Sequence, residues 1–207
     1  MNSSLKKTAL LKVDPANPDK SAISTAADAL RKGALVAFPT ETVYGLGVNM
    51  LDEAAVSRLY EIKKRPRTKP FTVLVSDTGV IEKAWDCNLS KEARSLADRF
   101  WPGPMTMILK SSSGEKIGFR VPDNKIAMML VTEAKVPIAT PSANVSGSVP
   151  ARCAGDVLKE FGGRIDIIID GGPSKVGIES TVVDLTAPQP KIVRQGAIPA
   201  REILNSL

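Results

Sequence analysis

The chain alternates short apolar runs with segments of helical spacing, and glycine or proline separates them. Residues 34–38 and 106–109 are too short for a helix and are typical of buried strands. Residues 21–32 repeat apolar side chains at helical spacing and end at Gly33, a common helix stop. A chain in which strands and helices take turns in this way predicts an α/β layer fold.

The same criteria predict the other elements. Further helices are expected over 52–62, 90–101, 124–132 and 154–161. Further strands are expected over 10–13, 72–75, 117–121, 137–140, 165–169, 181–185 and 191–194. Several connections are too short for a crossover helix, so we expect a mixed parallel and antiparallel sheet with flanking helices. We expect the 207 residues to form one domain, 1–207.

Composition limits the chemistry and the compartment. The chain has no histidine, which excludes a Ser-His-Asp or Cys-His catalytic group and any zinc site that needs imidazole. Its two cysteines, Cys87 and Cys153, lie far apart, as is usual in a reducing cytosol. No apolar run approaches the ~18 residues of a membrane span, so we expect a soluble, cytoplasmic protein. The net charge of +6 indicates an anionic partner or serves solubility.

The densest cationic feature is the segment 63–69, which ends a predicted helix. Five of its seven residues are lysine or arginine. One interpretation is a solvated surface whose charge complements the helix C-terminus. The other is a clamp for an oligophosphate, stiffened by Pro66 and Pro70, in which Arg65 offers a planar fork and Lys63 a point charge.

Three hydroxyl-rich segments follow or precede predicted strands, namely 38–47, 139–147 and 177–181. Ligands of open α/β sheets bind where strands end, and hydroxyl groups suit a small polar ligand. Structural turns have the same composition. Arg120 stands inside the apolar run 117–122, where it needs an anion, either an internal carboxylate or that of a substrate.

Together, in this order, these motifs resemble the YrdC-like family, the threonylcarbamoyl-AMP synthases. The resemblance rests on residues 39–46, on Lys63-x-Arg65, on 101–106 and on Ser142-x-Asn144, and it extends over about 22–198. It implies a twisted mixed α/β sheet with a large basic cleft. It also implies a nucleotidyltransferase that makes threonylcarbamoyl-AMP and pyrophosphate from L-threonine, bicarbonate and ATP. That product serves tRNA processing, through the N6-threonylcarbamoyl modification of adenosine 37 by a downstream transferase machinery.

The resemblance also implies roles for single residues. Lys63 and Arg65 are expected to be catalytic. The ATP site is expected to comprise Lys63, Arg65 and Lys69 at the phosphates, Ser142 and Asn144 at the nucleotide, and Arg194 closing over it. The threonine site is expected to comprise Thr42, Arg120, Thr140 and Ser180. Mg²⁺ is expected to be carried by the ATP phosphates, because no carboxylate cage is visible in the sequence.

The sequence departs from the family pattern in two places. Leu74 stands where many members have a histidine near the threonine site. The sequence ends at Leu207, without the C-terminal domain of longer members, so the N-terminal segment is a candidate for closing the site.

Two other functions stay open. One is a paralogue of changed substrate that makes another carbamoyl-adenylate, for which Leu74 is the argument. The other is a module that binds double-stranded RNA or tRNA through the cationic segment 63–69. Aromatic residues make up only 4% of the chain, too few for an extensive stacking platform. Weak tRNA binding beside the enzyme activity is compatible with the same charge.

Overall fold

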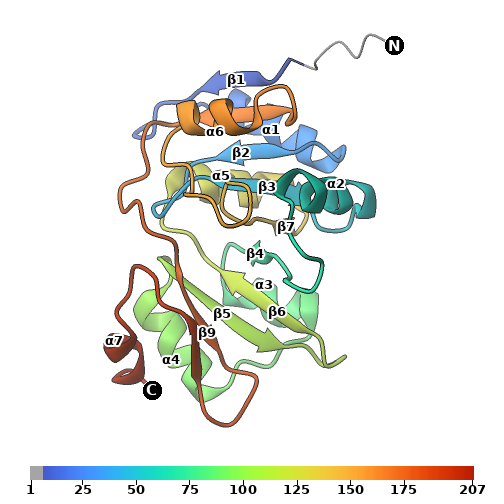
Figure 1. The fold of residues 1–207 in the computed structure, drawn as a ribbon. Helices are drawn as coiled ribbons and strands as arrows, with labels where there is room; N and C mark the ends of the chain where they lie inside the picture. The colour runs from blue at the N-terminus through green and yellow to red at the C-terminus, as the bar shows by residue number, and fades with distance from the viewer. Residues whose placement is uncertain (1–6) are drawn as a thin grey trace.

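The computed structural model describes residues 7–207, and its elements form a ten-stranded sheet with helices on its faces (Figure 1). The strands are β1 (Ala9–Lys12), β2 (Val36–Phe38), β3 (Gly45–Asn49), β4 (Thr72–Leu74), β5 (Met105–Lys110), β6 (Lys116–Arg120), β7 (Ile138–Ala139), β8 (Ile167–Asp170), β9 (Thr181–Asp184) and β10 (Lys191–Arg194). The helices are α1 (Lys20–Arg31), α2 (Glu53–Lys63), α3 (Thr78–Trp85), α4 (Lys91–Phe100), α5 (Lys125–Ala134), α6 (Ala154–Phe161) and α7 (Ala200–Leu204).

The sheet has the strand order β1-β8-β2-β3-β7-β4-β6-β5-β9-β10. The pairs β1–β8, β8–β2, β4–β6 and β5–β9 are parallel, and the other five pairs are antiparallel. The predicted mixed α/β sheet is therefore confirmed. Among residues 7–207, no helix combines the length and the apolar composition that crossing a membrane requires.

In the half of the sheet around β2, alternate side chains enter two different cores. Val36 and Phe38 pack into a cluster with residues of α1 and α5, such as Leu30 and Leu130. Ala37, between them, packs into a cluster with residues of α2 and α6 on the other face. This half thus has helices on both faces, which explains why its strands read as unbroken apolar runs in the sequence (Figure 1).

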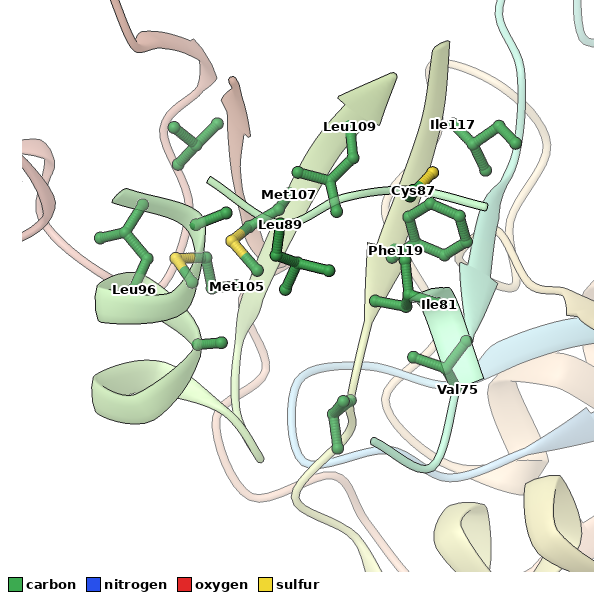
Figure 2. Close-up of a cluster of buried hydrophobic side chains, with 14 of the residues drawn as sticks. Val75, Ile81, Cys87, Leu89, Leu96, Met105, Met107, Leu109, Ile117 and Phe119 are labelled. Carbon is green, nitrogen blue, oxygen red and sulfur yellow. The ribbon is translucent and has the colours of Figure 1, made fainter. Parts of the chain in front are cut away.

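In the other half, α3 and α4 cover one face of the sheet, whereas on the opposite face Leu74 of β4 packs into the cluster of Val36 and Phe38. Val73, Met107, Phe119 and Val183 come from four neighbouring strands and enter one cluster. The cluster is completed by residues of α3 and α4, and Figure 2 shows Ile81 and Leu96 facing the strands. The side chains that alternate with these residues point to the opposite face, and that face carries the site described below.

Side-chain caps explain why several helices begin where the sequence predicts. Asp19, Asp52, Ser90 and Asn124 each accept a hydrogen bond from a backbone N–H in the first turn of the helix that follows. Such a cap satisfies a backbone donor that has no partner within the helix. The starts of these helices are therefore local properties of the sequence.

Three elements are not among those predicted, namely β3, α3 and α7. β3 lies in the segment 38–47 and beyond, which its glycines and hydroxyls mark as a turn. The glycines are required there because a Cβ at Gly47 would lie 2.8 Å from Phe38 Cε1 and 2.9 Å from Ile138 Cγ2. The close approach of β2 and β7, and not strand propensity, thus selects glycine in β3.

The single-domain prediction over 1–207 stays a prediction, and residues 1–6 lie outside the described part of the chain. The proposed closure of the site by the N-terminal segment falls in part on these residues.

Replacing Phe119 tests the core of the β5–β6 half. The side chain is fully buried and lies edge-on to Trp85, with ring centroids 5.0 Å apart. We expect Phe119→Ala to lower the free energy of unfolding by about 3–5 kcal/mol in urea denaturation, because it leaves a cavity. Leu51→Ala, at a side chain that is 72% exposed, is the control and is expected to change it by about 0.5 kcal/mol or less. Equal effects would contradict this description of the core.

Candidate functional site

A cavity that is partly open to solvent lies on the face of the sheet opposite α3 and α4. The strands place their side chains there by alternation. Leu74 and Arg120 are paired across β4 and β6, one residue beyond the core pair Val73 and Phe119. Thr106 of β5 likewise follows a core methionine and lines the cavity. These strand residues of the lining therefore stand on the second face of strands whose first face forms the core, and loop residues complete the lining.

Seven of the ten predicted site residues line this cavity. They are Thr42, Arg65, Arg120, Thr140, Ser142, Ser180 and Arg194. They come from segments that lie far apart in the sequence. Lys63, Lys69 and Asn144 are not part of the lining.

Arg120 is buried and has an internal carboxylate. Its Nη2 lies 2.6 Å from Glu41 Oε1, in a pair whose side chains are 9% and 5% exposed. The same Nη2 donates to Thr42 Oγ1 at 2.9 Å, and Nε donates to the Gly103 carbonyl at 3.2 Å. The Glu41 contact is an ion pair without hydrogen-bond geometry. Of the two anions expected for Arg120, the internal one is thus present.

Arg194 is held by the residues that precede β9. Its Nη1 donates to Glu179 Oε1 at 2.9 Å. Its Nε and Nη2 donate to the Ser180 carbonyl at 3.1 and 2.9 Å, and Nη2 also donates to Ser180 Oγ at 3.1 Å. Ser180 Oγ lies 2.9 Å from Thr106 Oγ1 in turn. Arg194 and Ser180, which were predicted to bind different substrates, therefore contact one another.

Arg65 is the cavity guanidinium without a carboxylate partner among residues 7–207. Its Nε donates to the Lys69 carbonyl at 2.8 Å and its Nη2 to the Pro70 carbonyl at 3.0 Å. The group also lies over the Phe71 ring, 5.4 Å from the centroid. Burial lowers the pKa of Arg65 from its usual value and Arg194 acts in the same direction, whereas Tyr60 and Glu179 oppose both. The Lys69 side chain is outside the lining, and this residue contributes its carbonyl to the loop.

Lys63 is one of the largest fully buried side chains, with 1% exposure. Its Nζ lies 2.5 Å from the Ser142 carbonyl and 2.6 Å from the Asn144 carbonyl. Burial lowers the pKa of Lys63 to about 8, and nearby Arg65 acts in the same direction, whereas Glu179 opposes both. The ammonium therefore binds the backbone behind the cavity wall.

The Asn144 side chain also lies outside the cavity lining and binds the backbone. Its Nδ2 donates to the Val145 and Ser148 carbonyls at 3.0 and 2.7 Å, and its Oδ1 accepts from Ser142 Oγ at 2.7 Å. These bonds use both amide hydrogens. The Ser142-x-Asn144 motif is thus a turn that fixes Ser142 in the lining.

Three functional candidates were missed in the sequence reading: Glu41, Thr106 and Glu179. Glu41 lies in the motif 39–46, but nothing local identifies Arg120 as its partner. Glu179 lies in the polar turn 177–181 and is the carboxylate of the cavity lining. Thr106 could have been found, because it alternates with apolar residues in a predicted strand.

The described residues 7–207 contain no group of three or more histidine, cysteine, aspartate or glutamate side chains placed to hold a metal ion. Glu179, the carboxylate in the lining, is paired with Arg194.

The Sua5/YciO/YrdC family model, whose description is telomere recombination, matches residues 28–196. The chain belongs to this family. It is 43% identical over 190 residues to the threonylcarbamoyl-AMP synthase of Pyrococcus abyssi, covering 87% of this chain and 56% of that protein. It is 40% identical over 191 residues to the Bacillus subtilis protein of the same name, covering 87% and 55%. The chain thus spans just over half the length of these relatives.

Solved structures of the Sua5/YciO/YrdC family have the same fold. The P. abyssi Sua5 complex with L-threonine superposes with a TM-score of 0.91 at 40% identity, covering 97% of this chain and 61% of that one. Escherichia coli YciO superposes with a TM-score of 0.85 at 26% identity, covering 95% and 99%. The mixed open sheet predicted from the sequence is therefore the family fold.

The buried position of Lys63 predicts an unusual titration. The group has an ordinary pKa of 10.5 and about 8 in the folded protein, so between these values the unfolded chain binds more protons. The contribution of Lys63 to stability is then present above the unfolded pKa and is lost as the pH falls through the folded pKa. NMR titration of the lysine side chains should find one that titrates near pH 8, and Lys63→Arg should remove that resonance. A set of lysines that all titrate above pH 10 would contradict this.

Proposed function

We propose that the chain makes threonylcarbamoyl-AMP and pyrophosphate from L-threonine, bicarbonate and ATP. The observation that carries the proposal is the convergence of Arg65, Arg120 and Arg194 on the cavity that Thr140 and Ser142 also line. Cations and hydroxyls in one cavity suit a substrate set with a triphosphate, a carboxylate and a carbamate. Relatives in the family bear the name of this activity.

The proposed reaction needs no protein nucleophile. The amine of threonine combines with bicarbonate to give a carbamate and water. A carbamate oxygen then attacks the α-phosphorus of ATP, a new O–P bond forms, and the bond from that phosphorus to the β-phosphate oxygen breaks to release pyrophosphate. The protein has to position the reactants and stabilise charge, which fits a chain without histidine.

The contacts support a division of labour among the predicted residues. Arg65 has no carboxylate partner in the described chain, so its charge is free for the phosphates. Arg120 and Thr140 lie together with Ser180 in the lining, where they would take the threonine and its carbamate. Lys63 and Asn144 would act indirectly, by holding Ser142 against the nucleotide.

Mg²⁺ would arrive on the ATP phosphates, as part of the substrate. The product would pass to a transferase that modifies adenosine 37 of tRNA, and we expect both to act in the cytoplasm. Any binding of tRNA would be weak and would depend on the cationic segment 63–69.

Pyrophosphate release tests the proposal directly. The purified protein should release it from MgATP only when L-threonine and bicarbonate are both present, with serine and glycine as comparisons that test the effect of Leu74. Release with another amino acid alone would indicate a paralogue of changed substrate. Salt-dependent RNA binding without turnover would favour an RNA-binding module instead.

Arg65 and Arg67 form a matched pair for mutation. Both belong to the same loop, and each lies over an aromatic ring, Arg65 over Phe71 and Arg67 over Tyr60. Only Arg65 lines the cavity. We expect Arg65→Ala to lower kcat/KM for ATP about 100-fold, the usual loss on removing a charge-stabilising donor. Arg67→Ala should stay within about twofold, since its interactions are at the surface. Equal losses would remove Arg65 from the proposed phosphate site.

A further inference from the structure

The cavity contains two arginine–glutamate pairs of different character. The Arg120–Glu41 side chains are 9% and 5% exposed, whereas the Arg194–Glu179 side chains are 42% and 34% exposed. A buried pair is costly to separate, because each charge would be left without a partner in a poorly solvated place. An exposed pair contributes only about 0–1 kcal/mol and separates easily. Arg120 therefore stays paired with Glu41, whereas Arg194 can exchange Glu179 for another anion.

A bulge in β10 places the Arg194 side chain on the cavity face of the sheet. The β9–β10 register pairs Ile192 with Val183 and Arg194 with Val182, so Val193 is an extra, bulged residue. Opposite residues of an antiparallel pair share a face, so the bulge gives Arg194 the face of Val182. That is the face away from the core residue Val183, where the cavity lies. A regular strand would turn the side chain at position 194 to the other face.

The contacts of Arg194 leave little capacity for a ligand. A guanidinium has five N–H donors, and Arg194 uses four of them, three on Ser180 and one on Glu179. A phosphate bound in two-pronged fashion needs a pair of parallel N–H groups. With the contacts of this structure, no such pair is free. A phosphate can therefore engage Arg194 fully only by displacing one of these partners, and the exposed Glu179 carboxylate is the one that carries its own charge.

We propose that Glu179 is a positioning residue that pairs with Arg194 until the substrate phosphates bind and displace it. This rests on the proposed function, since it assigns the oligophosphate of the nucleotide as the competing anion. Glu179 thereby sets the affinity of the site, because an incoming phosphate competes with a tethered carboxylate for one guanidinium. Its removal improves anion binding, the opposite of the usual effect of deleting a lining residue.

Calorimetric titration with pyrophosphate in the presence of EDTA tests this. We expect Glu179→Gln to bind pyrophosphate about fivefold more tightly than the natural protein, which corresponds to loss of an exposed ion pair. In an Arg194→Met background the same change should give a clearly smaller gain, since the competition needs Arg194 and only the general charge effect of Glu179 on Lys63 and Arg65 is left. Glu82→Gln is the control, because Glu82 pairs with Arg94 across 2.5 Å on the surface and is not part of the cavity lining. It should not alter the affinity.

Three results would overturn the proposal. One is unchanged or weaker binding by Glu179→Gln, including no binding by any variant. Another is an equal gain in the Arg194→Met background, which would reduce Glu179 to a general repulsive charge. The third is a loss of binding by Glu179→Gln that appears only when Mg²⁺ is added, which would make Glu179 a metal ligand. Failure of the proposed function is separate, because it shows as absent threonine-dependent pyrophosphate release by the natural protein.

Discussion

A buried ammonium ties helix α2 to the loop after β7, and the geometry of the cavity depends on this contact. Lys63 is the last residue of α2, and its Nζ donates to the carbonyls of Ser142 and Asn144. The backbone reciprocates, because Ser146 N donates to the Lys63 carbonyl at 2.8 Å. A buried charge is tolerated when it is hydrogen-bonded in this way. Two walls of the cavity, one carrying Arg65 and the other Ser142, are thereby held together.

The three guanidiniums of the lining differ in how they are neutralised. Arg120 is paired with buried Glu41, Arg194 is paired with the exposed Glu179, and Arg65 binds carbonyls within its own loop and lies over the Phe71 ring. The site is therefore less cationic than its arginines suggest, and its free positive charge is concentrated at Arg65. Pairing of this kind limits repulsion among the three guanidiniums before a substrate binds. Because Arg194 can leave Glu179, its charge stays available to an anionic substrate.

The sequence patterns predicted most of the strands and all but two of the helices, because apolar periodicity and caps are local. They failed at β3, whose glycines suit a turn equally well; only the close approach of Thr140 to Gly45, and of Phe38 and Ile138 to Gly47, requires glycine there. Seven of the ten site residues implied by the family resemblance line one cavity, and the hydroxyl-rich segments at strand ends and the cationic segment 63–69 contain most of them. Lys63 and Asn144, expected at the phosphates and the nucleotide, stay predictions as ATP ligands. That the Lys63 ammonium also binds the Ser142 carbonyl, far away in the sequence, is something no spacing reveals.

What the sequence determined by itself was the α/β architecture, the starts of the capped helices and the kinds of group available for chemistry. Absence of histidine, an excess of cations and clustered hydroxyls favour a site that works by positioning and charge. The tertiary structure alone decided which cationic side chain lines the cavity, which one binds backbone carbonyls and which ones pair with a carboxylate. The reason is physical: the state of a charged side chain is set by its nearest partners, and here those partners, Glu41 for Arg120 and Ser142 for Lys63, lie 79 residues away along the chain in each case.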